Sequence, residues 1–128
     1  MDFLNESHMG NYRTLLAYKK AFALAMKIYH ISKKFPAEEK FGLTSQIRDS
    51  SRSVCVNIVE AYKRRRYRNY YTSKLNDSET ENAETQVWLD FALTCNYLSD
   101  QEYPEFTSDN DEVAKLILYM INNPEKFS

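Results

Sequence analysis

Helix-breaking residues are scarce in this 128-residue sequence, which has two glycines, Gly10 and Gly42, and three prolines, Pro36, Pro104 and Pro124. So few breakers over this length favour a small number of long helices. A chain of this length is also large enough for one domain with a real hydrophobic core. We therefore expect an all-α domain over residues 12–128, preceded by a flexible leader over residues 1–11.

The sequence lacks a run of about eighteen apolar residues, so we expect no membrane-spanning helix and no membrane partner. Its first ten residues lack the basic start and apolar core of a secretory signal. These two absences predict a cytoplasmic protein. The two cysteines, Cys55 and Cys95, lie in helical patterns without a metal or redox motif, which indicates buried, reduced thiols.

Recognisable catalytic motifs are also missing. There is no phosphate-binding glycine loop, no dinucleotide fingerprint and no nucleophile elbow. Asp77, Glu81 and Glu84 share one helical face, but a di-iron bundle needs Glu-x-x-His pairs on facing helices, and the only histidines are His8 and His30. We therefore expect no enzyme activity, no catalytic residue, no metal site and no cofactor. A solvated acidic face is favoured over a single Mg²⁺ site.

The stretch from Leu43 to Arg66 has the clearest helical pattern. Its apolar side chains recur at helical spacing at Ile47, Val54, Ile58 and Ala61. Thr44 or Ser45 is the predicted N-terminal cap of this helix.

Three further helices are predicted around this one. The first covers residues 12–34, and Phe35 and Phe41 in the following link are expected to cover the end of the bundle. A short connection over residues 67–69 precedes a helix over residues 70–98. The polar stretch 99–110 is predicted to be a loop, in which residues 103–106 can open a short helical turn, and Asp109 or Asp111 is predicted to cap the last helix. The predicted core positions of the 70–98 helix are Tyr71, Leu75, Ala83, Val87, Phe91 and Leu98.

Charge is divided unevenly along the chain. Residues 1–68 contain 14 Lys and Arg against 6 Asp and Glu, a net charge of +8. Residues 69–128 contain 3 against 12, a net charge of −9, which accounts for the total of −1. Such asymmetry indicates a dipolar surface. The favoured interpretation is that the two halves neutralise each other within one bundle.

The best candidate functional surface is the segment in which arginine alternates with tyrosine. Arginine pairs with phosphates and stacks on bases, and tyrosine offers a stacking face. Two structural explanations compete: positive charge favours a helix C-terminus, and the cluster can pair with acidic residues of its own or a neighbouring chain. The candidate nucleic-acid-binding residues are Lys63, Arg64, Arg65, Arg66, Tyr67 and Arg68.

Asn57 and Glu60 are spaced to share one face of the 43–66 helix. They can mark a pocket, but a buried hydrogen-bonded network that fixes helix register is favoured, because buried polar groups need partners. Tyr18, Lys19 and Lys20 are the candidate partners.

Several of these stretches together resemble a known family. The runs are Tyr18-Lys19-Lys20-Ala21, Phe35-Pro36, Gly42 to Arg48, Asn57-Ile58-Val59-Glu60 and Glu84 to Leu89. In order and spacing they resemble a family of small bacterial four-helix-bundle proteins, labelled ribosomal-protein-like because members are encoded in intervening sequences of 23S ribosomal RNA genes. The same family includes the accessory variability protein of diversity-generating retroelements.

This resemblance implies an antiparallel up-down four-helix bundle that assembles into a homopentameric ring without known catalysis. For the accessory proteins it further implies binding to RNA or DNA and to a reverse transcriptase. The sequence departs from the family at Cys55, where many members have proline, and at Ala61 and Lys63, where many have glycine. These departures leave the end of the 43–66 helix in doubt.

Two classes of function therefore remain open. One is a homo-oligomeric module that binds nucleic acid or acts as an adaptor. The other is a purely protein-binding scaffold with no nucleic-acid role.

Overall fold

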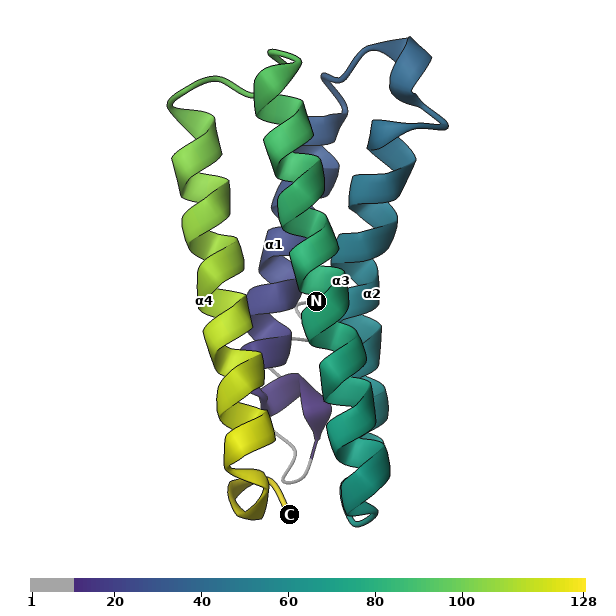
Figure 1. Cartoon of the computed structure of the whole chain (residues 1–128), viewed down its shortest axis with the longest axis vertical. Coiled ribbons are helices and arrows are strands. Elements are labelled where there is room, and N and C mark those ends of the chain that lie inside the picture. Colours follow the sequence, from purple (N-terminus) through teal and green to yellow (C-terminus); the bar gives the residue numbers. More distant parts are fainter. Residues whose placement is uncertain (1–10) are drawn as a thin grey trace.

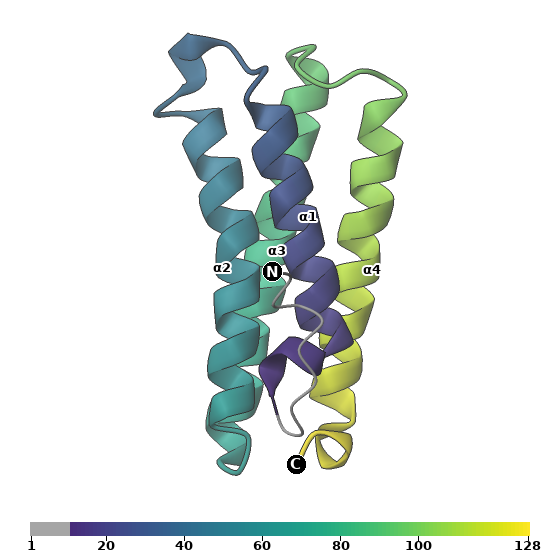
Figure 2. The ribbon, with the colours of Figure 1, turned by 180° about the vertical axis from the view of Figure 1, so that it is seen from behind.

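The computed structural model describes residues 11–128, in which four long helices lie side by side and successive helices run in opposite directions (Figures 1 and 2). They are α1 (Leu16–Ser32), α2 (Leu43–Lys63), α3 (Arg68–Thr94) and α4 (Glu102–Asn122). Short 3₁₀ helices, η2 (Tyr12–Thr14), η3 (Ala37–Glu39) and η4 (Pro124–Lys126), flank them, and residues 11–128 contain no strand. The prediction of an all-α four-helix protein is confirmed.

The predicted leader lies outside the described residues except for Asn11, whose side chain accepts a hydrogen bond from the Arg13 amide at 2.9 Å and so caps η2. None of the helices within residues 11–128 combines the length and the apolar content that crossing a membrane requires.

Helix α2 carries the apolar face predicted for it, because Ile47, Val54, Ile58 and Ala61 are all buried in the core. Its start differs from the prediction, since neither Thr44 nor Ser45 caps it. The Leu43 amide instead donates to the Glu39 carboxylate at 3.0 Å. The turn of η3 brings Glu39 over the exposed amides of the first turn of α2, where a negative charge is favourable.

Tyr71 and Leu75 of α3, and Leu98 just beyond its end, are buried as predicted, but from Ser78 onward the helix presents a different face to the core from the one predicted. Ala83, Val87 and Phe91 point outward, and Val87 and Phe91 are 47% and 53% exposed. Alternating steps of four and three residues, the spacing of a bundle seam, connect the residues of α3 that are buried. These are Tyr71, Leu75, Ser78, Asn82, Thr85, Leu89 and Ala92.

Three of these core positions are polar, and all three have partners. The Ser78 hydroxyl donates to the Val54 carbonyl at 2.9 Å, and the Thr85 hydroxyl donates to Ser50 Oγ at 2.8 Å. Asn82 Nδ2 donates to Asn110 Oδ1 at 2.9 Å, and Asn110 Nδ2 donates to the Asn82 carbonyl at 3.1 Å. Because each polar group is satisfied, this layer fixes the register of α3 against α2 and α4.

Replacing Asn110 with Leu should destabilise the fold by about 1–3 kcal/mol, because it removes the Asn110 Oδ1 acceptor of the buried Asn82 amide and the amide donor to the Asn82 carbonyl. The double variant Asn82→Leu/Asn110→Leu should lose less than the sum of the two single variants, since it removes both partners. Urea unfolding of the three variants measures this coupling. Strictly additive losses would show that the two amides do not depend on each other.

Helix α4 begins at Glu102, within the stretch predicted to be a loop. The Ser99 amide donates to the Glu102 carboxylate at 2.9 Å, and the Glu102 amide donates to Ser99 Oγ at 3.0 Å. This reciprocal pair is a capping box, which stabilises a helix start. Pro104 is tolerated because it lies in the first turn.

Just beyond the C-terminal end of α1, Phe35 is buried at the end of the bundle, as predicted. Its ring packs on that of Tyr97, with centroids 5.5 Å apart. Phe41 does not cover the bundle end: its side chain is 87% exposed. Helix α1 itself is shorter than predicted, because Leu15 has extended backbone angles that separate it from η2.

Candidate nucleic-acid interface

The six candidate residues Lys63 to Arg68 form a turn between two helices, which we call the basic turn. Lys63 is the last residue of α2 and Arg68 the first of α3, so α2 ends three residues before its predicted end. The Tyr67 amide donates to the Arg64 carbonyl at 2.9 Å and closes the turn. Figure 1 places it at one end of the bundle, away from the α1–α2 and α3–α4 connections.

Three arginines of the basic turn lie over tyrosine rings. The guanidinium carbon of Arg64 is 5.2 Å from the centre of the Tyr70 ring, that of Arg65 is 4.0 Å from Tyr62, and that of Arg66 is 5.0 Å from Tyr67. Arg65 also donates to the Tyr62 carbonyl at 2.8 Å. Stacking of this kind restricts the arginine side chains while leaving most of their N–H donors available.

These cations have no acidic partner in the described chain. Among residues 11–128, no carboxylate oxygen lies within ion-pairing distance of the side-chain nitrogens of Lys63, Arg64, Arg65, Arg66 or Arg68. All except Arg65 are exposed. The basic turn therefore presents a concentrated positive charge to solvent.

Two lysines of α1, Lys20 and Lys27, and Lys34 just beyond its end behave differently, because they pair with acidic residues of α4. Lys20 lies 3.1 Å from Glu112, Lys27 lies 3.0 Å from Glu105 and also contacts Asp109, and Lys34 lies 3.7 Å from Glu102. Burial alone would lower the pKa of Lys27, but its hydrogen bonds to Asp109 and Glu105 outweigh burial and raise it. The two halves thus neutralise each other along α1 and α4, as predicted, but not at the basic turn.

Asn57 and Glu60 lie on the half-buried face of α2 and are not in contact with the partners proposed for them. Asn57 Nδ2 donates to the Ser53 carbonyl at 3.0 Å, on its own helix. Glu60 pairs with Lys74 of α3 at 2.8 Å. The hydrogen-bonded network in the core is instead the layer around Asn82 and Asn110, which sequence analysis did not identify.

The acidic face of α3 holds no assembled metal site. Burial, followed by repulsion from Glu84, raises the pKa of Glu81. No group of three His, Cys, Asp or Glu side chains within residues 11–128 is arranged to hold a metal ion. His8 lies outside the described residues, and His30 is exposed.

The two cysteines have different environments, contrary to the prediction that both are buried. Cys95 is exposed just beyond the end of α3, whereas Cys55 is buried. Burial raises the pKa of the Cys55 thiol to about 12.

In a Cys95→Ser variant, the remaining Cys55 thiol should react very slowly with a thiol reagent between about pH 7 and pH 9, because the thiolate is the reactive form. Adding denaturant should make the reaction fast. A chromogenic disulfide reagent releases a coloured thiolate when it reacts, and the absorbance of this product measures the rate with and without denaturant. Fast labelling of the native variant would show that Cys55 is accessible and ionised.

Comparison with known proteins gives a family and a fold. The model of the 23S rRNA-intervening sequence protein family matches residues 13–119. A crystal structure from Bacteroides thetaiotaomicron, described as a protein with unknown function from the S23 ribosomal protein family, is 29% identical with a TM-score of 0.76. The alignment covers 84% of this chain and 96% of that one. No curated protein matches.

Proposed function

The chain belongs to the 23S rRNA-intervening sequence protein family, and from this premise we propose that it is a non-catalytic, homo-oligomeric protein that binds nucleic acid through the basic turn. The substrate class is the phosphate backbone of RNA or DNA. Arg64, Arg65, Arg66 and Arg68 supply the phosphate contacts together with Lys63, and Tyr67 offers a ring to an unstacked base.

The observation that carries this proposal is that, within residues 11–128, the cations of the basic turn lack acidic partners, whereas Lys20, Lys27 and Lys34 have them. If these cations paired with carboxylates of the acidic second half, their positive charge would be neutralised and would not attract a phosphate. In the described residues the ion pairs of the acidic second half lie along α1 and α4 and at Lys74, and none reaches the basic turn, which is left available to an anion from outside the chain.

Assembly strengthens this function, since a ring repeats the basic turn once in each subunit and converts weak contacts into avidity. A homopentamer is the favoured assembly. A partner protein, such as a reverse transcriptase, would then bind the same nucleic acid while it is bound to the ring.

Fluorescence anisotropy with labelled single-stranded RNA and double-stranded DNA tests the proposal. Binding should be largely independent of sequence. The logarithm of the association constant should fall linearly with the logarithm of salt concentration, by about 0.9 for each phosphate contacted on B-DNA. Absence of binding at low salt would contradict it.

The second candidate function is a protein-binding scaffold without a nucleic-acid role. The outward-facing Val87 and Phe91 favour it, because large apolar side chains at a surface mark sites of protein contact. A protein that assembles but binds no nucleic acid at low salt would support this candidate.

A further inference from the structure

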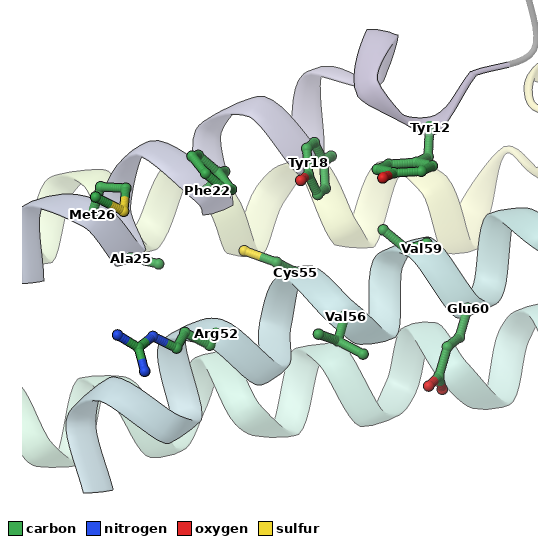
Figure 3. Close-up of a pocket in the computed structure, with 10 residues that line it drawn as sticks. All are labelled: Tyr12, Tyr18, Phe22, Ala25, Met26, Arg52, Cys55, Val56, Val59 and Glu60. Carbon is green, nitrogen blue, oxygen red and sulfur yellow. The ribbon is translucent and has the colours of Figure 1, made fainter. Parts of the chain in front are cut away.

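Helices α1 and α2 form the two walls of an open apolar groove of about 450 Å³ on the outside of the bundle. Figure 3 shows the side chains of the two helices directed into the space between them, with Tyr12 near one end and Arg52 at the α2 edge. Apolar contacts dominate the lining, and Val56 on the edge of α2 is 54% exposed. Its principal lining residues are Tyr18, Met26, Cys55, Val56 and Val59.

A second apolar surface lies on α3, which we call the α3 patch: Val87, Trp88 and Phe91. The Trp88 and Phe91 rings pack together with centroids 5.9 Å apart. Val87 and Phe91 are each about half exposed, although their residue types are those of a core. The polar core layer at Ser78, Asn82 and Thr85 turns Val87 and Phe91 outward, whereas Trp88 is partly buried against the core and its Nε1 is shielded from solvent.

Opposite charges accompany the two surfaces. Arg52 lines the rim of the groove, and within residues 11–128 its guanidinium has no carboxylate in ion-pairing distance. Glu84 lies three residues before Val87 on α3, close enough to Glu81 for the two carboxylates to interact, and neither has a basic partner in the described chain. The groove therefore has a cation without an acidic partner at its rim, where Arg52 lies over the Tyr29 ring, and the α3 patch has Glu84, a carboxylate without a basic partner in the described chain, one helical turn away.

We propose that the α3 patch of one copy of this chain docks in the α1–α2 groove of the next copy, with Arg52 facing Glu84 across the contact. This inference rests on the homo-oligomeric part of the proposed function. Because the two surfaces differ, the contact is head-to-tail, and every chain uses each surface once. Such a contact closes into a ring when the rotation between copies closes.

A mixing experiment with two variants tests this pairing. Val56→Asp places a charge in the groove and leaves the α3 patch intact, whereas Phe91→Asp does the reverse. Each variant alone should be monomeric, with association weakened roughly 30-fold or more, as for a residue at the centre of an interface. Mixed together they should form a 1:1 heterodimer that grows no further, because only one groove and one α3 patch remain usable.

Size-exclusion chromatography with light scattering measures the masses. Leu118→Asp on α4 is the matched control, because Leu118 is 47% exposed and lies on neither surface. It should assemble like the wild-type chain. Circular dichroism of each variant separates loss of contact from loss of fold. A charge swap adds an independent readout: Arg52→Glu and Glu84→Arg should each weaken assembly, and the double variant should restore it.

The outcomes distinguish this inference from the proposed function. A monomeric wild-type chain would overturn both the homo-oligomer and the pairing. An oligomeric wild type whose two variants stay monomeric when mixed would overturn the pairing alone. A Val56→Asp variant that assembles like the wild type would also overturn it, and would leave the groove to another occupant, such as a helix of a partner protein.

Discussion

Replacing Ile58 with Asp is expected to unfold the bundle. Ile58 lies in the second half of α2 and is completely buried. The substitution removes a large apolar side chain, which alone costs about 2–5 kcal/mol, and adds a carboxylate without a partner. Together these losses approach the whole stability of a typical domain, about 5–15 kcal/mol. Far-UV circular dichroism should show the loss of helix, or urea unfolding a greatly lowered midpoint.

The matched comparison is again Leu118→Asp, which adds the same charge at an exposed position of α4. Surface substitutions of this kind usually change stability by less than about 0.5 kcal/mol. Val54→Asp, four residues before Ile58 on the same buried face, should behave like Ile58→Asp. If Ile58→Asp unfolds at the wild-type midpoint, the assignment of the α2 core face is wrong.

The success of sequence analysis on α2 and its errors at Ala83, Val87 and Phe91 of α3 have the same physical origin. On α2 the apolar side chains coincide with the buried face, so periodicity alone locates the core. On α3 the buried face includes Ser78, Asn82 and Thr85, whose burial depends on hydrogen-bond partners on α2 and α4. Those partners are distant in sequence, so a search for apolar periodicity does not find them. It assigned the apolar Val87 and Phe91 to the core instead.

Helix boundaries show the same division between local and distant causes. The start of α4 was predictable, because Ser99 and Glu102 have the spacing of a capping box. The turn at Arg64 was not, since no glycine or proline marks it. The helices end there because the chain reverses to pack α3 against α2.

For the candidate site, the sequence located the cations but not their surroundings. Counting charges by halves predicted neutralisation, which holds for Lys20, Lys27 and Lys34 against α4. Only the packing of the helices shows that the basic turn lies beyond the reach of those carboxylates. The stacking of arginines on Tyr62, Tyr67 and Tyr70 likewise depends on the turn geometry.

Replacing Arg64, Arg65 and Arg66 together with Ala should abolish most nucleic-acid binding without dissolving the oligomer. If each arginine contacts one phosphate, each contributes about 0.9 logarithmic units to the association constant at ~0.1 M salt, relative to 1 M. The triple variant should then bind roughly 500-fold more weakly at that salt concentration. The slope of the logarithm of its association constant against the logarithm of salt concentration should be shallower by the equivalent of about three phosphate contacts.

The charge-matched control is Lys33→Ala/Lys34→Ala/Lys40→Ala, which removes three exposed cations from the segment between α1 and α2. Figure 1 places that segment at the other end of the bundle from the basic turn. A nonspecific effect of net charge would weaken both triple variants equally. A contact at the basic turn should weaken only the arginine variant, and light scattering should give both variants the mass of the wild-type assembly. If the arginine variant binds as tightly as the wild type, the Arg–Tyr stacks have a structural role at the α2–α3 turn, and the scaffold function is favoured.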